Sequence, residues 1–128
     1  MLFLVLAGLA SAGAPAPTLV GTWNGDGSCT AEMDGMEGAD AATIQMVAVG
    51  MEQNQYVFTG TTMQHLQKGL PAPTPEPYKV LAHQGTSWTI EMTGMGGAPQ
   101  RTEVVITQDR MRMLRAGKLV LCARRAAG

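Results

Sequence analysis

The last third of the chain alternates short strand-like runs with turn residues, and this pattern constrains the fold more than any other feature. The runs cover residues 78–84, 87–92, 101–107 and 111–122, the last of which continues from 111–114 through 119–122. Turn residues separate them at Gly85-Thr86, in the stretch 94–99, at Gln108-Asp109 and at Ala116-Gly117. Regularly spaced short strands with tight turns are typical of an antiparallel meander. The sequence therefore predicts a mainly β fold, with an up-and-down meander that forms a small barrel or half-barrel.

The segment between residues 39 and 50 is open to two interpretations. Four apolar residues recur at the spacing of one face of a helix: Ile44, Val47, Ala48 and Met51. Residues 43–49 would also alternate acceptably as a strand. We favour one short helix over 39–50, in the N-terminal third. After it, residues 55–64 are predicted to form a strand with Gly60 at a bulge or bend. The alternating prolines of residues 69–77 predict an extended surface loop.

The N-terminus has the features of an export signal. Residues 1–12 form an apolar run that is too short to cross a bilayer as a helix and ends in Ala10-Ser11-Ala12, an A-x-A cleavage site. We expect a signal peptide over 1–12, a disordered spacer over 13–17 and a single β domain over 18–125. An uncleaved apolar tail is the alternative. The predicted location is periplasmic or extracellular, with no stable membrane insertion of the mature chain.

The two cysteines agree with this location. Cys29 and Cys122 lie near the two ends of the predicted domain. An even number of cysteines at such positions in an exported protein predicts a disulfide that ties the first and last elements together. Two buried thiols are the alternative.

Charge is unevenly distributed along the chain. No basic residue interrupts the acidic side chains of the segment 26–52, which are Asp26, Glu32, Asp34, Glu37, Asp40 and Glu52. Seven basic residues follow position 100, namely Arg101, Arg110, Arg112, Arg115, Lys118, Arg124 and Arg125. The basic segment could form a face that binds a protein or an anionic surface. We favour the alternative that it pairs with the acidic segment, because the disulfide would bring the two together. The net charge of −1 and the few aromatic residues argue against nucleic-acid binding.

Several short stretches resemble those of small exported bacterial lipocalin-like proteins. The chain begins its domain with Leu19-Val-Gly-Thr-Trp23, continues with Val57-Phe-Thr-Gly-Thr-Thr62 and Tyr78-Lys-Val, and ends with a hairpin from Ile106 and a last strand that closes on Cys-Ala-Arg-Arg. The resemblance implies a barrel or open half-barrel of about eight strands that holds an apolar ligand. It implies no catalytic residues.

The main functional prediction is therefore the binding of a small apolar molecule. The candidate pocket or core residues are Trp23, Tyr56, Phe58, Trp88, Met111 and Met113. A barrel this small can also be filled by its own side chains, which would leave no cavity. We predict that the protein is not an enzyme, because the sequence offers no nucleophile with a base and no clear pair of carboxylates.

Methionine supports a second functional prediction. Met33 and Met36, and likewise Met92 and Met95, form M-x-x-M pairs, and thioether sulfur is a soft ligand that selects Cu(I). His83 would complete such a site. Methionine is also a flexible filler of irregular cores, and we favour that interpretation. No cofactor is predicted apart from this copper alternative.

Overall fold

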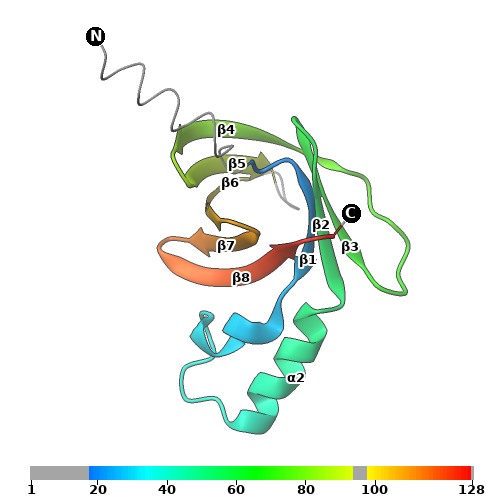
Figure 1. Cartoon of the computed structure of the whole chain (residues 1–128), viewed down its shortest axis with the longest axis vertical. Coiled ribbons are helices and arrows are strands. Elements are labelled where there is room, and N and C mark those ends of the chain that lie inside the picture. The colour runs from blue at the N-terminus through cyan, green and yellow to red at the C-terminus, as the bar shows by residue number, and fades with distance from the viewer. Residues whose placement is uncertain (1–17, 94–97, 128) are drawn as a thin grey trace.

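Antiparallel pairing joins all the strands of the structure into one ring (Figure 1). The computed structural model describes residues 18–93 and 98–127. Its eight strands form a closed barrel in chain order: β1 (Gly21–Gly25), β2 (Asn54–Phe58), β3 (Thr62–Gln67), β4 (Glu76–Gln84), β5 (Ser87–Thr93), β6 (Pro99–Thr107), β7 (Arg110–Arg115) and β8 (Lys118–Arg125). The predicted mainly β meander is confirmed, and of its two forms the structure has the closed barrel. The predicted signal peptide and spacer lie outside the described residues.

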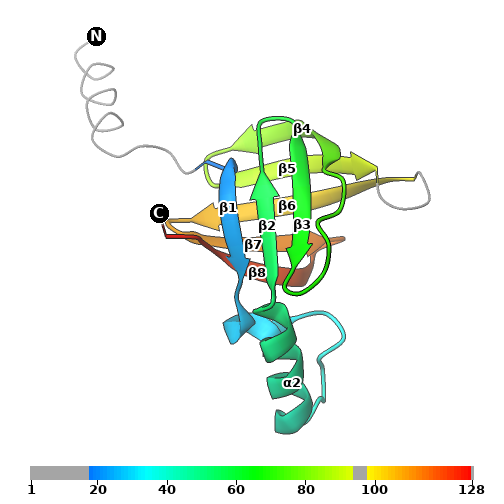
Figure 2. The ribbon, with the colours of Figure 1, turned by 90° about the vertical axis from the view of Figure 1, so that its right-hand side faces the viewer.

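The barrel consists of two groups of strands that cross steeply. Figure 2 shows β1, β2 and β3 running across the direction of β4 through β8, so the two groups face each other across the core. β1 closes the ring by pairing with β8 from Trp23 to Gly25. The seam between β3 and β4 is short, with two residue pairs, Thr62 with Pro77 and Met63 with Glu76.

Two strands predicted as single elements are hairpins. The run 55–64 divides into β2 and β3 at a turn where the Thr59 amide donates to the Thr62 carbonyl (2.8 Å), and Gly60 lies in this turn. The run 111–122 divides into β7 and β8 at Ala116-Gly117, whose φ angles of 52° and 77° are those of a tight two-residue hairpin turn. The prediction of one continuous strand over 55–64 was therefore wrong. In the run 111–122 the predicted turn residues at Ala116-Gly117 are confirmed, and they separate two strands.

A helical insertion lies between β1 and β2. It contains the 3-10 helix η1 (Gly27–Glu32) and the α-helix α2 (Ala41–Met51), which lies outside the barrel (Figure 2). The Asp40 carboxylate caps α2 by accepting a hydrogen bond from the Thr43 amide (2.8 Å). The helix predicted over 39–50 is confirmed. Among the described residues, no helix is long and apolar enough to cross a membrane.

Glycine allows α2 to lie close to the start of the insertion. The four apolar residues at helical spacing are half-buried, and α2 contacts η1. A Cβ atom at Gly27 would lie 2.6 Å from the Ala48 carbonyl oxygen. The close approach of the two backbones at this point therefore requires glycine.

The barrel core is built from cross-strand rows of inward-facing side chains. One row runs from Trp88 through Val104 and Met113 to Leu121, and the next contains Ile106, Met111 and Ala123. The Trp23 indole of β1 donates a hydrogen bond to the carbonyl of Leu19, which precedes the strand (3.1 Å). The Arg125 guanidinium lies 4.1 Å from the centre of the Trp23 ring.

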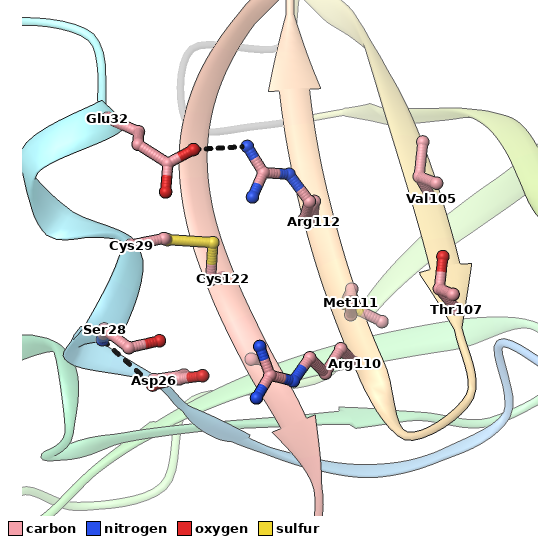
Figure 3. Close-up of a pocket in the computed structure, with 11 residues that line it drawn as sticks. Asp26, Ser28, Cys29, Glu32, Val105, Thr107, Arg110, Met111, Arg112 and Cys122 are labelled. Carbon is pink, nitrogen blue, oxygen red and sulfur yellow. Dashed lines mark hydrogen bonds and ion pairs between the residues drawn. A yellow bond between two sulfur atoms is a disulfide. The ribbon is translucent and has the colours of Figure 1, made fainter.

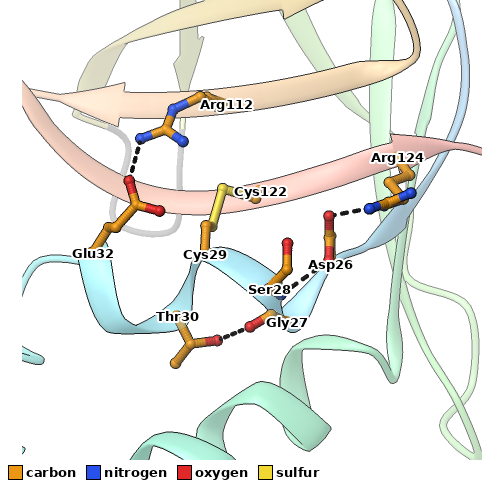
Figure 4. The surroundings of a disulfide bond; sticks show 9 residues. All are labelled: Asp26, Gly27, Ser28, Cys29, Thr30, Glu32, Arg112, Cys122 and Arg124. Atoms are coloured by element: carbon orange, nitrogen blue, oxygen red, sulfur yellow. Dashed lines mark hydrogen bonds and ion pairs between the residues drawn. A yellow bond between two sulfur atoms is a disulfide. The ribbon is translucent and has the colours of Figure 1, made fainter.

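A disulfide and three ion pairs join the insertion to the barrel. Figure 4 shows the disulfide and the ion pairs of Asp26 and Glu32. Cys29 of η1 and Cys122 of β8 form the predicted disulfide. The ion pairs are Asp26–Arg124 (3.0 Å), Glu32–Arg112 (3.1 Å) and Asp34–Lys118 (3.7 Å). This confirms the predicted pairing of the acidic and basic segments. We call the disulfide and these ion pairs the clasp. Each exposed pair contributes about 0–1 kcal/mol, whereas a disulfide that closes a loop this long contributes on the order of 4 kcal/mol in the chain-entropy description.

We predict that Gly27→Ala lowers the free energy of unfolding by about 1–3 kcal/mol, because the added methyl group forces α2 away from η1. Gly60→Ala is the matched control, since a Cβ there meets nothing within 4 Å. Urea denaturation followed by tryptophan fluorescence measures both changes. Equal effects of the two substitutions would show that the contact at Gly27 is not tight.

Candidate functional site

The residues predicted to bind an apolar ligand all lie in the barrel core. Trp23 and Met111 are fully buried and Phe58 is 1% exposed. Tyr56, Trp88 and Met113 are also buried, and all six belong to a single cluster of packed side chains. The inner positions of the barrel are therefore occupied by the protein's own side chains, which is the filled-barrel alternative.

The methionines of the copper prediction lie in different places. Met33 packs against the disulfide on the outside of β8, whereas Met92 belongs to the core inside the barrel. Met95 lies outside the described residues. The described part of the chain thus does not form a single site from both M-x-x-M pairs. Nor do three or more His, Cys, Asp or Glu side chains gather there closely enough to hold a metal ion.

Both histidines stack on aromatic rings. His83 lies 4.1 Å from the Trp88 ring and bonds to the Gly85 carbonyl oxygen (3.0 Å). His65 lies 4.8 Å from the Tyr56 ring and bonds to Asn54 Oδ1 (2.9 Å). Burial lowers the pKa of the His65 imidazole, because the charged form loses water. These contacts give both rings a structural role.

A groove lies on the outside of the barrel, between η1 and strands β6 to β8 (Figure 3). Its volume is about 400 Å³. Asp26, Ser28 and Glu32 line one side, Arg110 and Arg112 line the other, and the disulfide lies between the two sides. The sequence analysis anticipated the pairing of acidic with basic residues, but not the hollow between them.

The Asp26 carboxylate of this groove has two hydrogen-bond donors as partners. It accepts hydrogen bonds from the Ser28 amide (2.9 Å) and from Arg124 Nε (3.0 Å). Burial opposes its ionisation, but these hydrogen bonds and the Arg124 charge together hold its pKa below the usual value. Asp26 is therefore an anion at neutral pH and holds Arg124 in place.

The second feature that the sequence analysis missed is the outer side of α2. The helix has eleven residues, none of them charged and none of them buried. Met46 is 70% exposed and Val49 is 49% exposed. With the exposed Ala42, they form a stripe at helical spacing, which we call the outer stripe. The absence of charge over residues 41–51 was visible in the sequence and was the available signal.

No family model, curated protein or solved structure matches this chain. The resemblance to lipocalin-like proteins therefore stays a prediction.

We predict that His65 makes the protein less stable on mild acidification. Its folded-state pKa lies below the ordinary 6.5, so the unfolded chain takes up a proton before the folded one does. Stability is therefore unaffected above the ordinary pKa and falls as the pH drops from about 6.5 toward 5. Thermal unfolding across this range should show the loss in the native protein and in His83→Gln, but a smaller loss in His65→Gln. The same loss in all three would rule out His65 as its source.

Proposed function

We propose that the protein is a docking module, in which the barrel supports α2 and the outer stripe inserts into an apolar groove of another protein. The observation that supports this proposal is an uncharged helix with no buried residue. We further propose that it acts outside the cytosol, where the disulfide is stable.

Exposure of the apolar outer stripe to water is energetically unfavourable. A helix that is apolar on all sides is normally buried, and exposed apolar patches mark interaction sites. Here the inner side of α2 contacts η1, while Met46 and Val49 remain largely exposed. A partner that covers the outer stripe would remove these side chains from water, as in other helix-in-groove complexes.

Charge at the ends of α2 indicates what kind of groove fits. Asp40 stands before the first turn, where its carboxylate caps the helix. Glu52 stands at the other end, where a negative charge opposes the helix dipole. The side-chain charge of Glu52 therefore does not stabilise the helix. An acidic residue at each end of an apolar stripe is complementary to a groove with basic residues on its rim, and we propose a partner of this kind.

Two other occupants fit less well. Two copies packed through α2 would place acidic residues side by side in either orientation. In antiparallel packing, Asp40 would lie beside Glu52 of the other copy. In parallel packing, Asp40 would lie beside Asp40 and Glu52 beside Glu52. A helix that lies on a bilayer usually has Lys or Arg on a distinct polar side. α2 has neither.

We predict that a photo-crosslinking amino acid in place of Met46 captures a partner protein that the same amino acid in place of Glu103 does not. Glu103 is exposed on β6, outside α2, and serves as the control position. The captured protein is then purified and its affinity is measured against substituted forms of this chain.

Capture supports the proposal only if the affinity depends on the outer stripe and on charge. Met46→Asp should weaken binding about tenfold or more, because it places a charge in an apolar groove. Met46→Leu should retain the affinity. Glu52→Lys should weaken binding while helix content, followed by circular dichroism, is kept or increased.

Several results would contradict the proposal. One is a Glu52→Lys protein that binds as tightly as the native form or more tightly. Another is a dimer in sedimentation velocity that Met46→Asp dissociates, which would identify a second copy as the occupant. Binding to phosphatidylglycerol vesicles that Met46→Asp abolishes would identify a membrane instead.

A further inference from the structure

We infer that the groove beside the disulfide is a binding site for small organic anions, with Arg110 as the residue that recognises the charge. The ligand class is a carboxylate or phosphate joined to a short apolar body. The groove and the outer stripe of α2 are different surfaces, so this site does not depend on the docking of α2.

The shape of the groove follows from the strand register. Val105, Arg112 and Cys122 lie opposite one another on β6, β7 and β8, and so do Arg110 and Arg124 on β7 and β8. The buried side chains of β7 alternate with these, because Met111 and Met113 point into the core. The arginines therefore project outward, toward the wall that η1 forms (Figure 3).

The arginines on the strand side of the groove are not all paired with carboxylates. Glu32 neutralises Arg112 at one end of the groove (3.1 Å), and Asp26 neutralises Arg124 at the other (3.0 Å). Arg110 lies on the same face as both arginines. Within the described residues, its guanidinium makes no ion pair and no hydrogen bond. Arg110 is therefore the cation of the groove that remains available to a ligand.

An arginine in this position suits a carboxylate or a phosphate. Its planar fork of donors matches two oxygen atoms of either group. The Ser28 side chain faces it from the opposite wall (Figure 3), where its hydroxyl group is within the groove. The ion pairs on both sides keep the neighbouring arginines in fixed positions, so the anion meets a wall that is already ordered.

The rest of the groove can receive an apolar body. The sulfur atoms of Cys29 and Cys122 lie between its walls, and Val105 lines the far side. A volume of about 400 Å³ is in the range of small-molecule sites. Asp26 and Glu32 add negative charge to the wall on the η1 side, and this charge disfavours ligands with several negative charges. The site thus selects an anion that has one charged group and an apolar remainder.

The test is a titration of the oxidised protein with octanoate, followed in ¹H–¹⁵N correlation spectra. Octyl phosphate is the second anion, and octanamide is the neutral probe of the same length. We expect the anions, but not octanamide, to shift the amide signals of η1 and β7. Whichever anion binds more tightly identifies the preferred charged group.

Arg110→Gln should weaken binding about tenfold or more, because it removes a charge-assisted hydrogen bond. Arg101→Gln is the matched control, since Arg101 is an exposed arginine on β6 that lies 4.0 Å from Glu91. It should change the affinity by less than about twofold. Thermal unfolding checks that both variants are folded.

Three results would overturn the inference. Equal binding of octanoate and octanamide would mean that charge is not recognised. Equal affinity of native protein and Arg110→Gln would remove Arg110 from the site. The absence of any shift up to the solubility limit of both anions would show that the groove binds neither class.

Discussion

The clasp between the helical insertion and the last two strands is the constraint on which both proposed binding surfaces depend. The insertion contributes no strand to the barrel, and its helices would otherwise be tied only through β1 and β2. Cys29–Cys122 fixes η1 against β8, and ion pairs fix the residues on both sides of it. Because η1 contacts α2, the same bonds set the position of the outer stripe. The segments that these bonds join form the two walls of the groove.

The interior of the barrel is filled by the protein's own side chains. Large side chains from both groups of strands meet in its centre, among them Trp23, Phe58 and Ile90, and these are essentially without exposure. An interior filled in this way is densely packed and resists deformation. Both proposed binding surfaces consequently lie outside the barrel, on segments that the barrel holds in place, as is common for functional loops on a stable scaffold.

The sequence allowed the fold class to be predicted because turn chemistry is local. Gly85 and Gln108-Asp109 mark the ends of strands without any knowledge of the partner strand. The runs 55–64 and 111–122, each counted as one strand before the structure showed two, mark the limit of this reasoning. Gly60 can lie in a bulge or in a turn, and only the pairing of Phe58 with Met63 distinguishes these cases. Similarly, the left-handed φ of Ala116 is set by the hairpin and not by the residue itself.

The two proposed binding surfaces were less accessible to prediction from the sequence. Ile44, Val47, Ala48 and Met51 indicate which side of α2 packs, but not that η1 covers this side alone. The groove depends on which side chains of β6, β7 and β8 point outward and on the distance of η1 from them. The pairing of Asp26 with Arg124 was predictable in outline, because the disulfide brings their segments together.

Hydrogen exchange tests most directly whether the clasp holds the insertion. The comparison is between the oxidised protein and the double variant Cys29→Ser/Cys122→Ser, with amide exchange measured along the whole chain. If the clasp sets the position of α2, exchange should become faster in η1 and α2, while β5 and β6, which lie at the centre of the β4–β8 group, keep their protection. Unchanged protection of α2 in the variant would contradict this account, because the disulfide would then contribute nothing to holding the helix in place.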